Sequence, residues 1–484
     1  MRELGHDVLL IINRKELLHR PESRQPEYRD KYPEWIMDAS NLSEWEFISL
    51  NPSIQPVLDI LATYDALILN HIGPSFLPLL AQPGISLLTG SDLDYYADFG
   101  TVDNLHMHSD ESYTKSREGI LNRRIWTDFI QRQRDGIQLS IKVHCLPPGV
   151  TPQGDKVMAE IGVPMSNRFF YFVGEVKKIK PTSQPNNIPV RVFSPVRVTW
   201  KLPVGPGQSS LDFKGSDVMV RGLSLFFKKT GIKLDICLVR KGLHVRELEE
   251  LILNEGIDDQ VTWLNEMSQL EVWSEMARSD IVLEQFGDSI IAKNGMDAMS
   301  AGRPVIGNMR PEILGDTIPI CQAGTPEELC FQLERLVFDL REREQVGRVG
   351  REYIEKHANV EELSKACLEF IEASREQSKK TTLPSSAVYT YFLYQRQSWI
   401  ERQAALEFEI QQKIERENEL QQYFVSIVSG KLKSLVLERQ FLQKKGYCWV
   451  APLPNLKSIA DGMDWFARSS LLLFEDEKLL TLSH

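Results

Sequence analysis

Two carboxylates and a run of small residues stand close together between residues 284 and 297. Glu284 follows the apolar run Ile281–Leu283, and Asp297 lies in a short helix-forming stretch before a second apolar run, Pro304–Gly307. A strand that ends in an acid and continues through a loop into a helix presents main-chain N–H groups at the carboxyl edge of a sheet. Such a place suits a diphosphate, and we expect it to be held by Gly287, Ser289, Asn294 and Gly295.

The two carboxylates suit the rest of a nucleotide-linked sugar. A carboxylate one turn inside such a helix can accept hydrogen bonds from ribose hydroxyls, which is the role expected for Asp297. Glu284, at the strand end, would face the sugar. The alternative is that both carboxylates merely cap or solvate helix ends.

A parallel sheet is needed to hold these residues, and the surrounding sequence predicts one. Strand-like runs alternate with helix-like runs, which is typical of a doubly wound α/β sheet. Strands are expected at 188–196, 234–239, 261–264, 281–283 and 304–307, and helices at 217–228, 247–254, 270–277, 295–301, 341–356 and 360–374. A further helix begins at Thr325-Pro-Glu-Glu328, where a Thr N-cap is followed by Pro and by Glu three residues on.

The first 150 residues predict another sheet of the same kind. Val8–Ile12, Ala66–Leu69 and Ile85–Leu88 are short apolar runs of the parallel-strand type. Residues 1–7 are typical of the tail of a helix that stops at a glycine, so we expect a preceding strand and half a helix to be missing. Asp92 follows the third run, at the kind of strand end where ligands gather, and is a candidate catalytic carboxylate.

The stretch Asp297-Ala-Met-Ser-Ala-Gly-Arg-Pro-Val-Ile306 resembles the acidic signature of retaining glycosyltransferases of family 4. In that signature an acid, often followed by Gly-Phe-Gly, precedes Glu-Ala-Met-Ala-x-Gly-x-Pro-Val-Ile. Here Asp297 stands where the signature has the glutamate of Glu-Ala-Met. The loop between Glu284 and Asp297 is longer than in the commonest form of the signature. The resemblance is strong over roughly residues 187–372, weak over 1–150 and absent beyond about 380. It implies the GT-B fold of two Rossmann-like domains.

The resemblance also implies two cations that clamp the donor diphosphate. Arg197 follows a predicted strand and Lys214 stands before Gly215 at a helix start, so they match the family's arginine and lysine by local context. Fixed cations there would stabilise a departing nucleoside diphosphate more than the bound donor. Because these cations take the place of a metal, no metal and no cofactor is expected. Both positions could instead be ordinary surface charges.

The acceptor side is less well marked. Thr89-Gly-Ser-Asp92 resembles the family's His-Gly-x-Asp segment, with Thr89 in place of the histidine. His71 is an alternative for the histidine role, although a single histidine in such a loop is more often structural.

The composition excludes several classes of protein. The net charge is −11, which disfavours nucleic acid as a partner, and 42% hydrophobic residues give ample material for globular cores. The six cysteines are scattered and predict neither a zinc site nor a disulfide framework. No apolar run approaches the ~20 residues of a membrane-spanning helix. We therefore expect a cytoplasmic protein, with peripheral contact at the inner membrane face left open.

The character of the sequence changes after residue 375. A linker is expected at 379–386, and apolar residues then recur at helical steps, interrupted by Lys413 and Glu417. A packed helical hairpin and a coiled coil both stay open, with self-association through 400–440 as one outcome. No role is assigned to residues 446–484.

The sequence thus predicts an α/β protein in three parts. These are an acceptor-side Rossmann-like domain (1–150), a nucleotide-sugar-binding Rossmann-like domain (151–375) and a helical, coiled-coil-like extension (376–484). The expected reaction moves a sugar from a nucleoside diphosphate sugar to a hydroxyl of a glycan, a lipid-linked or a small-molecule acceptor, with retention of configuration. The alternatives are a non-catalytic relative that serves as a scaffold or regulatory subunit, and a nucleotide-sugar epimerase.

Overall fold

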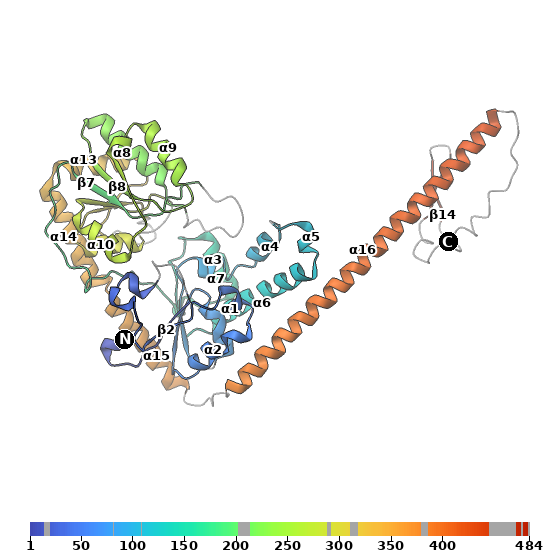
Figure 1. Ribbon diagram of the computed structural model, residues 1–484, viewed down its shortest axis with the longest axis horizontal. Coiled ribbons are helices and arrows are strands. Elements are labelled where there is room, and N and C mark those ends of the chain that lie inside the picture. Colours follow the sequence, from blue (N-terminus) through green and yellow to red (C-terminus); the bar gives the residue numbers. More distant parts are fainter. Residues whose placement is uncertain are drawn as a thin grey trace. The chain divides into compact units, whose positions relative to one another are not determined.

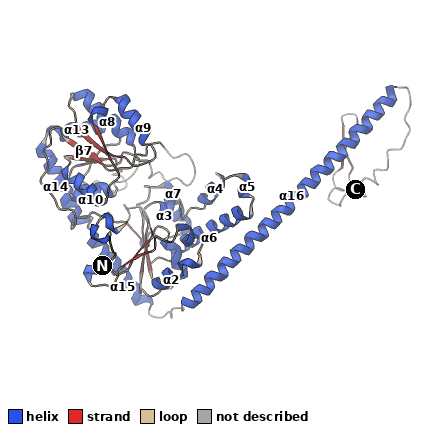
Figure 2. Ribbon diagram, viewed as in Figure 1, coloured by secondary structure: helices blue, strands red, loops and turns tan. Residues whose placement is uncertain are grey.

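The structure is a computed structural model, and it describes most of the chain. The described residues are 1–13, 20–80, 82–107, 109–201, 213–287, 292–309, 318–378, 386–444, 471–475 and 478–482. They form two compact units, Met1–Phe408 and Glu409–His484. The first unit holds two layered α/β halves, in which strands lie between helices (Figures 1 and 2).

The second α/β half is built on a parallel sheet of six strands within the described residues. Its strands are β7 (Arg191–Ser194), β8 (Asp235–Val239), β9 (Val261–Leu264), β10 (Ile281–Leu283), β11 (Val305–Gly307) and β12 (Cys321–Gln322). They lie side by side in the order β12-β11-β10-β7-β8-β9, and each neighbouring pair is parallel. Counted from β7, this is the strand order 3-2-1-4-5-6 of a doubly wound nucleotide-binding sheet.

Helices connect these strands and cover the sheet. They are α8 (Ser216–Thr230), α9 (Val245–Glu255), α10 (Gln269–Arg278), α11 (Lys293–Ser300), α13 (Pro326–Phe338) and α14 (Leu340–His357). The central strand β10 is buried throughout, as expected for a parallel strand covered on both faces. The predicted series of strands and helices is confirmed, including the Thr325 cap of α13, whose hydroxyl accepts a hydrogen bond from the Glu328 amide.

The first α/β half contains two separate parallel sheets within the described residues. Its strands are β1 (Leu10–Ile12), β2 (Ile36–Asp38), β3 (Leu67–Asn70), β4 (Gly84–Leu87), β5 (Lys142–His144) and β6 (Arg168–Phe169). Its helices are α1 (Glu44–Ile48), α2 (Gln55–Leu61), α3 (Ser91–Asp94), α4 (Gly100–Met107), α5 (Glu111–Thr114), α6 (Arg117–Leu139) and α7 (Pro152–Ile161). Strand β1 pairs with β2, and β3 to β6 form the larger sheet in sequence order. A cavity is lined by residues along β1 and β3, so these two edges face a common space.

The first half extends beyond the expected boundary at residue 150. Helix α7 packs Val157 and Met158 into one core with Val143 of β5, and β6 pairs with β5. Helix α15 (Val360–Ser378), assigned by sequence to the second domain, also returns to this half, where Cys367 and Ile371 pack with Ile85. The Pro-Gly turn after β5 was predicted to be a domain boundary. It instead connects β5 to α7, whose apolar face packs against the same sheet.

The C-terminal region contains α16 (Ser386–Lys444), one continuous helix of 59 residues. The helical hairpin considered from the sequence is therefore wrong, whereas most of the predicted linker lies outside the described residues. The start of α16 belongs to the first unit: Ile400 packs with Phe129 and Ile130, and Arg396 forms an ion pair with Asp128. Two short strands, β13 (Leu471–Glu475) and β14 (Lys478–Leu482), pair antiparallel in the second unit. Among the described residues, no helix is both long and apolar enough to cross a membrane.

Candidate functional site

The six-stranded sheet has its topological switch point between β7 and β10. The chain winds outward in opposite directions from these two central strands, so a crevice is expected at their carboxyl ends. Ser194 is the last residue of β7, and Glu284 directly follows β10. The predicted site residues of this half therefore come from loops at this edge.

Two of these loops are joined by direct contact of their backbones. The Phe286 amide donates a hydrogen bond to the Lys214 carbonyl at 2.8 Å. Gly215 has a φ of +63°, and a Cβ there would lie 2.5 Å from the carbonyl carbon of Phe286. A Cβ at Gly287 would lie 2.0 Å from the Phe213 oxygen. Both glycines are thus required by close approach, and the contact fixes Lys214 beside the loop that carries Glu284.

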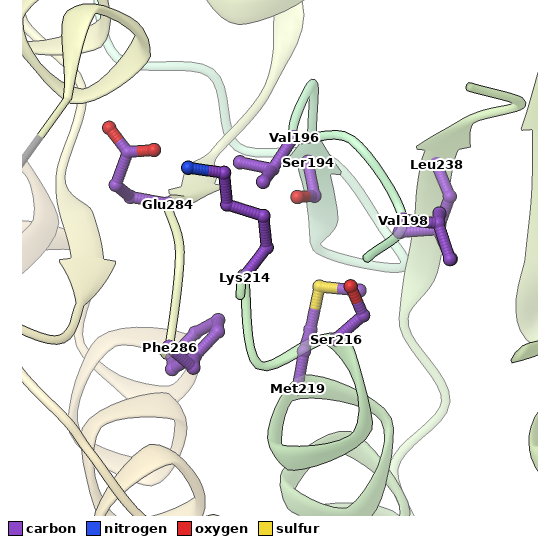
Figure 3. Close-up of a pocket in the computed structure, with 9 residues that line it drawn as sticks. All are labelled: Ser194, Val196, Val198, Lys214, Ser216, Met219, Leu238, Glu284 and Phe286. Carbon is purple, nitrogen blue, oxygen red and sulfur yellow. The ribbon is translucent and has the colours of Figure 1, made fainter. Parts of the chain in front are cut away.

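These loops enclose a small pocket at the start of α8 (Figure 3). Its lining comes from β7, β8, the segments that follow β7 and β10, and the first turn of α8: Ser194, Val196, Val198, Lys214, Ser216, Met219, Leu238, Glu284 and Phe286. The Lys214 amine points toward the Glu284 carboxylate in Figure 3 and donates a hydrogen bond to Gln285 Oε1 at 2.8 Å. The pocket therefore combines a cation, a carboxylate and a helix start, over an apolar floor.

Glu284 caps the start of α11. Its carboxylate accepts hydrogen bonds from the amides of Gly295 at 2.6 Å and Ala292 at 3.2 Å, both through Oε2, and from its neighbour Gln285 at 3.2 Å. Burial raises the pKa of the Glu284 carboxyl, while the Gly295 amide and the positive charge of Lys214 act in the opposite direction. The residue thus sits at the predicted strand end, and it already occupies the amide of Gly295 that was expected to meet a phosphate.

Asp297 lies in α11 and is fully buried where this helix packs against α10. Its Oδ2 accepts hydrogen bonds from Trp273 Nε1 at 2.9 Å and Gln269 Nε2 at 3.3 Å, and its Oδ1 forms an ion pair with Lys293. Burial raises the pKa of the Asp297 carboxyl, and Lys293 opposes that effect. Asp297 therefore joins two helices in this structure. Its partners Trp273 and Gln269 were not singled out by sequence, because nothing in their spacing marks them.

The remaining predicted residues of this half have different surroundings. Arg197 is exposed and lies between Val196 and Val198, both of which line the pocket. The carbonyl of buried Gly287 accepts a hydrogen bond from Asn308 Nδ2 at 3.0 Å. Asn294 is half-buried in the first turn of α11, and Ser289 lies outside the described residues.

Asp92 joins the loops that follow β3 and β4. Its Oδ2 accepts hydrogen bonds from the His71 and Thr89 amides, each at 3.2 Å, and its Oδ1 accepts one from the Thr89 hydroxyl at 3.3 Å. Burial raises the pKa of the Asp92 carboxyl, against these hydrogen bonds. The His71 ring packs edge-on against Tyr96. The segment Thr89–Asp92, which resembles the family's His-Gly-x-Asp, therefore lies at the carboxyl end of β4. Its Asp92 carboxylate is hydrogen-bonded to main-chain amides.

By sequence, no known protein family and no curated protein matches the chain. Solved structures are similar at low identity. A TarM variant from S. aureus, in complex with fondaparinux, α-GlcNAc-glycerol and UDP, is 14% identical with a TM-score of 0.44, over 66% of this chain and 58% of TarM. Sucrose-phosphate synthase from Thermosynechococcus elongatus is 12% identical with a TM-score of 0.46, over 70% of this chain and 81% of that one.

WaaG, a glycosyltransferase involved in lipopolysaccharide biosynthesis, is 14% identical with a TM-score of 0.44, over 73% of this chain and 88% of that one. The chain thus spans little more than half the length of TarM. Likenesses this distant carry no argument about function. The parallel α/β architecture, with Rossmann-type strand order in the second half, is established by the sheets themselves.

Proposed function

We propose that the chain is a glycosyltransferase that takes a sugar from a nucleoside diphosphate sugar. The observation that carries this proposal is the meeting of Lys214 and Glu284 in one pocket, at the switch point of a doubly wound sheet and at the start of α8. A departing diphosphate gains negative charge as the bond to the sugar breaks. A fixed ammonium and a helix start favour that state over the bound donor.

The proposed roles follow the order of groups in the donor. Arg197 and Lys214 bind the diphosphate together with the loop amides around Gly287, Ser289, Asn294 and Gly295, and Asp297 accepts the ribose hydroxyls. Glu284 contacts the donor sugar, and Asp92 acts on the acceptor side. In this scheme the cations replace a metal and the sugar is transferred with retention of configuration. The acceptor is a glycan, a lipid-linked or a small-molecule hydroxyl compound, with peripheral membrane contact in the lipid-linked case.

The geometry adds one requirement to this scheme. A phosphate that takes the Gly295 amide must displace the Glu284 carboxylate, which holds that amide at 2.6 Å. The displaced carboxylate is then available to hydroxyls of the sugar. Donor binding and the orientation of Glu284 are therefore coupled in our proposal.

Nucleotide binding tests the cation. Calorimetric titration of the full chain with UDP, GDP and ADP is expected to give binding with at least one nucleotide, and Lys214→Met should weaken it at least tenfold, about 1.4 kcal/mol. Lys228→Met is the matched control. Lys228 lies in α8, the helix that begins next to Lys214, but it is exposed and forms an ion pair with Glu255. Equal affinity of the wild type and Lys214→Met, or no binding by the wild type, would contradict the proposal.

Turnover separates the enzyme from a non-catalytic relative. The second candidate, a scaffold that binds nucleotide without reaction, is favoured by one observation: the carboxylates of Glu284 and Asp297 already bond to protein groups. For an enzyme, Glu284→Gln should retain nucleotide binding and slow donor hydrolysis or transfer by about 10²-fold. Nucleotide binding with no turnover in either protein would establish the scaffold.

A further inference from the structure

The exposed part of α16 carries an apolar stripe that no neighbour covers within the described residues. Leu406, Ile410, Leu420 and Phe424 are between 42% and 51% exposed. The steps between them are those of alternating a and d positions of a heptad, and Lys413 and Glu417 fill the two positions in between. A single helix with such a stripe gains stability only when the stripe packs against something.

Between Leu406 and Phe424 the stripe is symmetric about Glu415; the next apolar position, Ile427, lies outside this symmetric part, opposite Gln403. Leu406 and Phe424 lie nine residues from it on either side, Ile410 and Leu420 five residues, and Lys413 and Glu417 two residues. The symmetry therefore pairs apolar with apolar positions, and a cation with an anion.

This symmetry distinguishes the two ways in which identical helices can pair. In a parallel pair, Lys413 would meet its own copy and Glu417 would meet its own copy, so like charges would face each other inside the seam. In an antiparallel pair that crosses at residue 415, each a position meets a d position of the other helix. Lys413 then meets Glu417 twice, and like charges are avoided.

We propose that two copies of this chain associate through their α16 helices in an antiparallel coiled coil centred on Glu415. Leu406 packs against Phe424 of the second copy, Ile410 against Leu420, and Lys413 pairs with Glu417. The proposal is independent of the proposed enzymatic function, since the seam contains no residue of the pocket.

The length of the seam sets the expected strength. From 406 to 424 the helix rises about 27 Å, so only a few apolar layers are buried and association should depend on protein concentration. Ile414, 52% exposed, lies beside the axis and adds apolar surface. Arg416 approaches its own copy on the other flank, where Glu419 of its own helix lies one turn away. The two charge pairs contribute to orientation more than to affinity.

Charge exchange tests the register. Sedimentation velocity on the full chain should show a monomer–dimer equilibrium, and Lys413→Glu or Glu417→Lys alone should weaken it at least tenfold, because each leaves like charges in contact. The double variant Lys413→Glu, Glu417→Lys restores the opposite pairing and should restore the dimer. Glu415→Lys, on the outer face of the helix, is the control for a charge reversal and should leave association unchanged.

Cross-linking tests the orientation independently. Under mild oxidation, a mixture of Ile410→Cys and Leu420→Cys chains should give more disulfide dimer than either variant alone, measured against the wild-type chain as baseline. A chain that stays monomeric at high concentration overturns the proposal. So does cross-linking of Ile410→Cys to itself, which indicates a parallel pair, and so does a double charge variant that dimerises no better than the single variants.

Discussion

Two opposing effects act on the pKa of the Glu284 carboxyl: burial raises it, whereas the Gly295 amide and the charge of Lys214 lower it. Because the net effect raises the pKa of this carboxyl above the ordinary 4.5, the folded state binds its proton more readily than the unfolded chain does. The contribution of Glu284 to stability should therefore rise as pH falls through the raised pKa toward 4.5. Urea unfolding of the wild type and of Glu284→Gln at a series of pH values checks this.

The difference between these two proteins isolates Glu284 from Asp92 and Asp297, whose carboxyl pKa values are also raised. The wild type should gain stability relative to Glu284→Gln on acidification. A relative loss in that window would mean that the Gly295 amide and Lys214 outweigh burial.

Asp297 and Trp273 form a buried hydrogen bond that should be measurable on its own. Trp273→Phe keeps most of the ring but removes the N–H that Asp297 accepts at 2.9 Å, and should cost about 1–3 kcal/mol of unfolding free energy. Asp297→Ala removes the acceptor of the same bond, so the double variant should cost less than the sum of the two single changes. Trp45→Phe, at a partly exposed tryptophan, serves as the control. Additive costs would contradict the pairing.

At the scale of elements, the close contact of two loops positions the pocket. Gly215→Ala should destabilise the protein more than Gly256→Ala, although both glycines have positive φ. At Gly256 a Cβ meets nothing within 4 Å, so only the left-handed backbone is strained, about 1–2 kcal/mol. At Gly215 it also meets the backbone of Phe286, which should separate the loops and weaken nucleotide binding. Thermal unfolding and nucleotide titration measure both effects, and equal losses for the two variants would contradict the close contact.

The elements of the second half could be read from sequence because their signals are local. Ile281–Leu283 is a short apolar run between turns, and Thr325 is followed by Pro and Glu, and the structure has these elements at those places. The partners of Glu284 and Asp297 could not be read in this way. The Gly295 amide and the Trp273 indole reach these carboxylates only through the loop and helix packing, which leave no spacing in the sequence.

The residue boundaries of the two α/β halves could not be predicted from the sequence either, for a related reason. The apolar faces of α7 and α15 show that both helices are covered, but not which sheet covers them. Similarly, Lys413 and Glu417 looked like interruptions of a packed stripe, so the sequence left a helical hairpin as open as a coiled coil. The structure keeps α16 continuous through both residues, so neither of them marks a turn.

For the whole molecule, the first compact unit should fold without most of α16. A chain of residues 1–408 keeps Ile400, which packs in the core of the first half, the buried Ala404, and the ion pair of Arg396 with Asp128. It should match the full chain in nucleotide affinity and in urea unfolding at low protein concentration, and should stay monomeric because it lacks most of the proposed seam. A chain of residues 1–395 loses these contacts. Its free energy of unfolding should be lower by about 2–5 kcal/mol, the cost of removing one large apolar side chain from a core. If both chains were equally destabilised, the stability of the α/β halves would depend on residues beyond 408, and the unit would not be self-contained.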